Sequence, residues 1–430
     1  MSATRPTNAP GRTSGRHHYR DTAEPVPPKL GHGHGHGPAP PASRRVRMLL
    51  GAVLVPVALA TLVGLWLTWP GDTPRSGADI GFGQRPVHGE VLAATSAPCT
   101  SGSAGVGESV AADQAKRCIS LDVQLTDGNS PGVTIQQVLP DEPSTPRFTV
   151  GDHVVLAYTG GNPSESGSYL VQDFQRGPSM LWLAGLFAAA VLLLGRWRGL
   201  ASLTGLGFSF LVLVAYLFPA ILTGGDPVIV GVLAASVIMF GVLYLTHGVS
   251  AQTSSAVLGT VLSLALIGML GTAFSAATQL TGLDDDSANL IRVLGHGVDA
   301  RGLLLAGMII GALGVLDDVT VTQTSAVWEL RRANPALGTR ALYTAALRIG
   351  RDHISSAVNT LALAYAGAAL PVLLTFSLSG QSFGTLITAQ NVAQEVVRTL
   401  VGSIGLVAAV PITTAIAAVV AQRDDIDSAA

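Results

Sequence analysis

Long apolar runs are the feature that most limits how this chain can fold. A helix rises about 1.5 Å per residue, so about 20 apolar residues cross the hydrocarbon core of a bilayer. Eight segments approach that length: residues 48–69, 179–195, 200–222, 227–246, 254–279, 301–325, 355–376 and 399–421. Only 12% of the 430 residues are charged, which is about half the share in a soluble domain. We therefore expect an all-α polytopic membrane bundle of about eight transmembrane helices, with the lipid bilayer around it.

The first apolar run is predicted to stay in the membrane. It begins directly after Arg44, Arg45 and Arg47 and ends at Trp69. Arginines mark the cytoplasmic end of a span and tryptophans its interface, and no small-residue cleavage site follows. Residues 48–69 therefore read as a transmembrane signal anchor and not as a cleaved signal peptide.

The segment ahead of this anchor, residues 1–43, is rich in Pro, Gly, Ser and Thr. Such a composition cannot bury a core, so we predict a disordered cytoplasmic tail. Within it His32, His34 and His36 alternate with glycine. Neutral imidazoles bind transition metals, but the low-complexity composition favours a flexible segment over a metal site.

Arginines in the short loops predict the orientation in the membrane. The loops on the side of the N-terminus hold five of them: Arg196, Arg198, Arg331, Arg332 and Arg340. The loop at residues 281–300 instead carries three consecutive aspartates. We expect both termini in the cytoplasm, with residues 422–430 as a short tail. Arginine also far outnumbers lysine, as in GC-rich bacterial genomes, so we expect a bacterial plasma membrane.

The long polar stretch at residues 71–177 is predicted to fold outside the cytoplasm. Apolar and polar residues alternate in three segments of it: residues 119–125, 133–138 and 152–157. This alternation is typical of half-buried strands, so we predict a small extracytoplasmic β-domain. Cys99 and Cys118 lie in the same stretch. Paired cysteines outside the cytosol usually oxidise, which favours a disulfide over two free thiols.

Two adjacent carboxyl groups lie in the apolar segment 301–325, where ionisable residues are costly and often functional. On a helix, one face carries small and oxygen-bearing residues: Gly311, Gly314, Asp318, Thr322 and Ser325. Asp317 lies on the neighbouring stripe. Such oxygens suit a hard cation or a shared proton. The alternative is a solvated, passive pair near the cytoplasmic end of the helix.

A second cluster of polar residues, at residues 348–360, overlaps the start of the apolar segment 355–376. Arg348 and Asp352 are four residues apart, the spacing at which an ion pair supports a helix, so we predict a structural pair. Asn359 and Thr360 lie at least a turn farther on, inside the apolar span, where helix support does not explain them. His353 is a candidate proton relay near neutral pH, and a surface histidine is the alternative.

The segment at residues 388–395, ahead of the last apolar run, is polar on one face and apolar on the other. A helix on the membrane surface and a re-entrant segment both fit this pattern, and we favour the surface helix.

Three familiar catalytic or nucleotide-binding motifs are absent. The sequence has no Walker A loop, no Gly-x-Gly-x-x-Gly turn and no His-Glu-x-x-His. ATP-driven transport by this chain alone is therefore not expected, and an intramembrane enzyme that uses Asp317 and Asp318 has the least support. A formal net charge of −2 gives no field for nucleic acid. We expect no enzymatic activity, no cofactor and no nucleic-acid partner.

The two polar groups resemble the YibE/F-like family of multi-pass bacterial membrane proteins. The residues that carry the resemblance are Gly314, Asp317, Asp318, Thr320, Gln323, Thr324 and Ser325, and Arg348, Gly350, Arg351, Asp352, His353, Ser355, Ser356, Asn359, Thr360 and Leu361. The resemblance implies a multi-helix membrane domain at residues 179–421 behind an N-terminal extracytoplasmic part. It implies no particular activity.

Two functions remain as expectations. The first is a permease or channel for a small ion or polar solute, with Asp317, Asp318 and Asn359 along the path. The second is a non-catalytic membrane scaffold or regulator that binds a second copy or an envelope partner, the latter through its β-domain. Convergence of these side chains on a water-accessible cavity favours the first, and a dry bundle favours the second.

Overall fold

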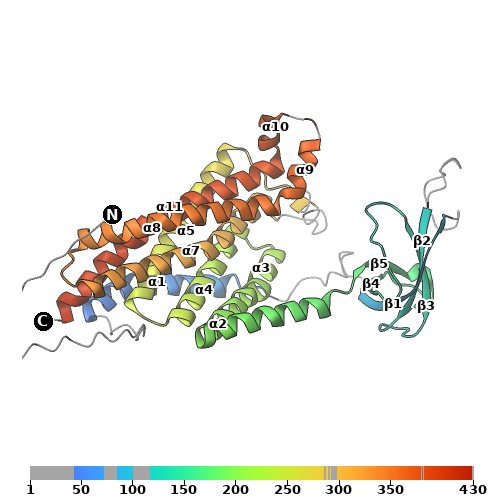
Figure 1. Cartoon of the computed structure of the whole chain (residues 1–430), viewed down its shortest axis with the longest axis horizontal. Coiled ribbons are helices and arrows are strands. Elements are labelled where there is room, and N and C mark those ends of the chain that lie inside the picture. The colour runs from blue at the N-terminus through green and yellow to red at the C-terminus, as the bar shows by residue number, and fades with distance from the viewer. Residues whose placement is uncertain are drawn as a thin grey trace, which may run out of the picture. The chain divides into compact units, whose positions relative to one another are not determined.

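A computed structural model of the chain describes residues 43–71, 85–99, 117–284, 287–288, 291, 298–378, 380 and 382–428. The predicted tail up to residue 42, with its alternating histidines, lies outside the described residues, as do Asp285 and Asp286. The described chain consists of long helices and one small domain of β-strands (Figure 1).

The helices are α1 Arg44–Leu67, α2 Gly177–Val212, α3 Phe218–Leu222, α4 Pro227–His247, α5 Ala251–Ala277, α7 Ala300–Ala333, α8 Thr339–Ala368, α9 Leu370–Leu378, α10 Phe383–Thr388 and α11 Gln390–Ser428. Six helical elements of the described chain are long and apolar enough to cross a membrane: Arg44–Leu67, Gly177–Leu222, Pro227–His247, Ala251–Ala277, Ala300–Ala333 and Gln390–Arg423. These helices support a multi-pass membrane protein. The predicted count of eight spans is not confirmed.

Two of the predicted spans, 179–195 and 200–222, fall in one bent element of 46 residues. The backbone of Arg196 is not helical, with φ 51° and ψ −126°. The bend is so sharp that a Cβ added to Gly199 would lie 2.3 Å from the carbonyl oxygen of Val191. The absence of a Cβ at Gly199 therefore permits this close backbone approach.

A third predicted span, 355–376, is divided between α8 and α9 at Ala369. Helix α8, which contains the first part of this segment, is too polar to count as a span by composition. The residues responsible, such as Asp352, His353 and Asn359, are the same ones that make α8 a candidate for function. Most of its side chains are exposed.

The amphipathic segment 388–395 does not form the separate surface helix that the sequence favours. Helix α10 ends at Thr388 and α11 begins at Gln390, so most of the segment forms the first turns of the last long helix. At the other end α11 continues to Ser428, so most of the predicted C-terminal tail is helical.

Small residues allow α5, α7 and α11 to pack closely. A Cβ at Gly259 of α5 would lie 2.2 Å from Thr413 Oγ1 of α11. A Cβ at Gly405 of α11 would lie 2.1 Å from Ile267 Cγ1 of α5. Thr260 and Thr320 join α5 to α7 through their hydroxyls at 2.9 Å, in a fully buried position. Close backbone approach and hydroxyl pairs of this kind are how helices associate in lipid.

The β-domain is one curled, antiparallel sheet with the strand order β3-β2-β1-β4-β5. Its strands are β1 Arg85–Pro98, β2 Arg117–Leu125, β3 Thr134–Pro140, β4 His153–Tyr158 and β5 Tyr169–Phe174. The two edges of the sheet lie close together. Gln137 Nε2 of β3 donates to the carbonyl of Ser166, shortly before β5, at 2.8 Å. The three alternating segments of the sequence correspond to β2, β3 and β4, and their inward residues form the core around Leu121, Val123 and Leu156.

The predicted disulfide between Cys99 and Cys118 is confirmed. Cys99 follows the end of β1 and Cys118 lies at the start of β2. The bond therefore joins two neighbouring strands at one end of the sheet, where residues 100–116 connect them.

One hydrogen-bonded pair of the β-domain predicts a dependence of its stability on pH. His88 donates to Asp127 through its backbone N–H at 2.6 Å, and its Nδ1 lies 2.5 Å from Asp127 Oδ2. Burial raises the pKa of Asp127, but the bonds with His88 bring it below the usual 3.8. A lowered folded-state pKa stabilises the fold above about pH 4, and this stabilisation is lost as the pH falls through the folded-state pKa.

We expect Asp127→Ala to lower the stability of the β-domain at pH 7 by about 1 kcal/mol or less, because the pair is half-exposed. Hydrogen exchange of the β1 amides in the intact protein measures this, and the difference from the unmodified chain should shrink toward pH 3. Asp122→Ala is the control, because the side chain of Asp122 reaches, among the described residues, only the Gln136 amide, at 3.5 Å. Equal effects of the two variants at pH 7 would contradict the assignment.

Candidate functional site

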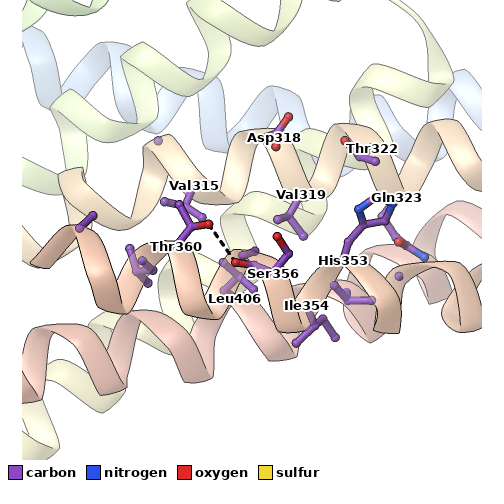
Figure 2. A pocket seen from close by; sticks show the side chains of 16 residues that line it. Val315, Asp318, Val319, Thr322, Gln323, His353, Ile354, Ser356, Thr360 and Leu406 are labelled. Carbon is purple, nitrogen blue, oxygen red and sulfur yellow. Dashed lines mark hydrogen bonds between the residues drawn. The ribbon is translucent and has the colours of Figure 1, made fainter. Parts of the chain in front are cut away.

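Helices α7, α8 and α11 border a cavity of about 440 Å³, which we call the Asp318 cavity. Its polar side chains come from α7 and α8 (Figure 2): Asp318, Thr322, Gln323, His353, Ser356 and Thr360. Leu406 and Val410 of α11 contribute apolar wall. Of the residues that we predicted for the path, Asp318, Thr322, His353 and Thr360 thus line one cavity. In Figure 2 the Asp318 carboxyl lies on the side of the α7 ribbon away from α8.

Helical spacing explains this convergence. Asp318 and Thr322 are one turn apart on α7, and His353, Ser356 and Thr360 follow three- and four-residue steps on α8, so each set shares a face. A buried hydrogen bond joins the two helices beside the cavity: Gln323 Nε2 of α7 donates to the carbonyl of Ala346 of α8 at 2.9 Å.

Several polar groups at the cavity have free hydrogen-bonding capacity. The Thr360 hydroxyl donates to the Ser356 carbonyl at 2.9 Å, within its own helix. Within the described part of the chain, the side chains of Asp318, Thr322 and His353 have no hydrogen-bond or ion-pair partner, and all three are exposed at the cavity. Polar groups at such depth in a helical membrane protein usually face a cavity or a partner.

Asp317 and Asp318 point to different surroundings, since neighbouring residues on a helix lie about 100° apart. Asp318 borders the cavity, whereas Asp317 does not. Asp317 Oδ1 is buried and has no hydrogen-bond partner among the described residues. The nearby Thr320 hydroxyl is engaged with Thr260 on α5. An orphan carboxyl oxygen inside the helices requires a proton or a cation to compensate for lost hydration.

The other predicted residues lie elsewhere. Ser325 accepts a hydrogen bond from Gln252 Nε2 of α5 at 2.8 Å and does not reach the cavity. Asn359 is exposed on α8 and does not line the cavity. Arg348 and Asp352 are also exposed, and the structure shows no ion pair between them.

Sequence reasoning missed the residues that shape the cavity. A Cβ at Gly350 would lie 2.5 Å from Val410 Cγ1 and 2.6 Å from Gln323 Oε1, so this glycine lets α8 approach both neighbours. The contribution of Leu406 and Val410 on α11 has no signal in the local pattern, because apolar residues of a membrane helix look alike whichever way they face.

A Gly-x-Ser-x-Gly pattern at residues 380–384 has the spacing of a hydrolase nucleophile turn. In the structure Ser382 is the N-cap of α10, where its Oγ accepts from the Thr385 N–H at 3.3 Å. The pattern follows helix α9 and ends in the first residues of α10, so it does not follow a strand. It therefore gives no support for a serine hydrolase.

Comparison with known proteins finds one relationship. A family model described as YibE/F-like protein matches residues 183–423, which is more than half of the chain and includes every residue that lines the Asp318 cavity. No curated protein and no solved structure matches the chain.

The packing at Gly350 predicts a difference between two glycines of the same cavity. Gly350→Ala should destabilise the protein, because overpacking costs about 1–3 kcal/mol, against a gain of about 1 kcal/mol in helix propensity. Gly314→Ala is the control, because nothing lies within 4 Å of its added Cβ. Thermal unfolding of the purified variants should give a lower midpoint for Gly350→Ala alone. Equal midpoints would show that α8 does not depend on this contact.

Proposed function

We infer that this chain, which belongs to the YibE/F-like protein family, is a non-enzymatic permease of the bacterial plasma membrane. The observation that carries this proposal is the Asp318 cavity, which is lined by a carboxyl, a hydroxyl and an imidazole without partners among the described residues. Two of its three helices, α7 and α11, are long and apolar enough to cross a membrane. Its volume of about 440 Å³ falls within the range of small-molecule sites, about 300–1,000 Å³. This size favours a small polar solute over a bare ion.

Each polar side chain then has a role that its surroundings allow. Asp318 and His353 offer an acceptor and a titratable donor from opposite helices, and Thr322 adds a hydroxyl on the same face as Asp318. A solute bound between them replaces the water that these groups lose in the membrane, which is how a permease offsets desolvation of its cargo.

Asp317 suits a coupling role. Its buried Oδ1 has no partner within the described chain, and Asp317 lies one position before the residue that borders the solute cavity. A proton taken up by Asp317 neutralises a charge that the helices do not otherwise compensate. We assign the driving proton to Asp317 and the solute to Asp318.

The orientation rests on two features. The connection between α7 and α8 carries Arg331, Arg332 and Arg340, which favours the cytoplasm. The Cys99–Cys118 disulfide favours an oxidising compartment for the β-domain. Together they support both termini in the cytoplasm and the β-domain outside.

One observation favours the scaffold function instead. Arg348, Asp352, Ser355 and Asn359 form an exposed stripe along α8, and none of them has a partner among the described residues. A helix of a second copy or of another membrane protein would cover such a stripe.

The reactivity of an introduced cysteine distinguishes the two functions, because it reports whether water reaches the cavity. Both native cysteines are in the disulfide, so the introduced cysteine is the free thiol that reacts. In lipid nanodiscs, Thr360→Cys should react with a charged methanethiosulfonate at least about tenfold faster than Leu363→Cys. Leu363 is 64% exposed on the same helix but does not border the cavity. The thiolate is the form of cysteine that reacts. Apolar surroundings raise the pKa of a thiol, and each unit of that rise lowers the thiolate fraction about tenfold. Equally slow reaction of both cysteines would mean a dry bundle and favour the scaffold.

A second variant tests the role of the carboxyl. Asp318→Asn should keep its unfolding midpoint within about 2 °C of the unmodified protein, because Asp318 has no partner to lose among the described residues. It should abolish solute-coupled proton movement, measured with a pH-sensitive dye in proteoliposomes supplied with a bacterial metabolite extract. Arg348→Ala is the control and should keep both properties. Markedly lower midpoints for both variants would point to a structural pair and against the permease.

A further inference from the structure

A second, larger cavity lies between α8, α9 and the first turns of α11, with a volume of about 690 Å³. It shares no residue with the Asp318 cavity. One part of its lining is apolar and rich in alanine: Ala362, Ala366, Ala368, Ala369, Val372, Leu373, Val392, Val396 and Leu400. The other part is polar: Asp284, Tyr365, Asn391, Gln394, Glu395, Arg398 and Thr399. We call it the Arg398 cavity.

Arg398 is the group in this cavity whose hydrogen bonds are least satisfied. Its Nη1 donates to Glu395 Oε1 at 2.7 Å, and its Nε is buried with no partner in the part of the chain that the structure describes. A guanidinium is always charged and has five N–H donors. One single-point contact with Glu395 leaves most of them without an acceptor, on a helix that is apolar enough to cross the membrane. Its side chain is still 26% exposed, so a ligand can reach it.

The carboxylates beside Arg398 have donors of their own. Glu395 accepts from Arg398, and Asp284 Oδ1 accepts from the Ser287 N–H at 2.7 Å. The unmet demand for an acceptor therefore lies at the Arg398 guanidinium itself, whose Nε is buried without a partner among the described residues. A planar anion such as a carboxylate meets it best, because it takes two parallel N–H bonds from one guanidinium.

We propose that the Arg398 cavity binds an amphipathic anion, whose head group meets Arg398 and whose hydrocarbon body lies along the alanine-rich wall. Asn391 and Tyr365 add neutral hydrogen-bonding groups at the polar end. The same chemistry is offered by a free fatty acid and by an anionic lipid of the bilayer. The proposal does not depend on transport through the Asp318 cavity.

A reporter cysteine in the cavity tests this on the full-length protein. Thr399→Cys lines the cavity, and its rate of labelling by N-ethylmaleimide is measured in nanodiscs of phosphatidylcholine. Octanoate should slow labelling at least threefold, whereas octanamide and octylammonium, which match its chain length, should not. Ser164→Cys, on an exposed loop of the β-domain, should be labelled equally fast under all conditions.

Two neighbouring variants assign the effect to the guanidinium. Arg398→Gln should abolish protection by octanoate, and Glu395→Gln should preserve or strengthen it, because the guanidinium loses its competitor. If Arg398→Gln does not fold, Arg398→Lys keeps the charge without the planar fork and should weaken protection at least twofold.

The lipid composition distinguishes the two sources. Replacing phosphatidylcholine by phosphatidylglycerol without octanoate slows labelling if an anionic lipid occupies the cavity, and leaves the rate unchanged if the ligand is a free acid. The proposal is overturned by equal protection from octanamide or octylammonium. It is also overturned by protection that survives Arg398→Gln, or by no protection from either octanoate or phosphatidylglycerol.

Discussion

The packing of α5 against α7 and α11 is the contact on which the helical part of this protein depends. Lipid gives apolar helices little reason to associate, so close van der Waals contact and hydrogen bonds must hold them together. Gly259 and Gly405 allow distances that a Cβ would forbid, and the Thr260–Thr320 bond adds a polar link. By placing α7 and α11 beside the same helix, these contacts set two walls of the Asp318 cavity.

Helix α8 is attached to this core by a different kind of contact. Four of its side chains or glycines are buried, Leu342, Ala346, Gly350 and Leu361, and a buried amide of α7 bonds its backbone at Ala346. The rest of the helix is largely exposed and polar. A helix with few buried contacts is the kind of element that moves most easily. Because α8 borders both cavities, its movement would change both of them.

The two groups of polar residues illustrate how far spacing predicts a site. The shared face of Asp318 and Thr322 follows from helical geometry alone, as does the separate position of Asp317. The same geometry placed Ser325 on that face, but the helix is long enough that Ser325 lies beside α5 and bonds Gln252. Arg348 and Asp352 have the spacing of an ion pair without forming one, since four-residue spacing permits contact between flexible side chains and does not enforce it.

The sequence by itself determined the membrane class, three of the five strands and the partners in the disulfide, because length, hydropathy and alternation act over a few consecutive residues. It did not determine the number of spans, since the bend at Arg196 and the polarity of α8 depend on what each segment packs against. Only the tertiary structure decided which polar residues share a cavity. That depends on glycines such as Gly350, which set the distance between helices far apart in the chain, and on which side of α11 faces them.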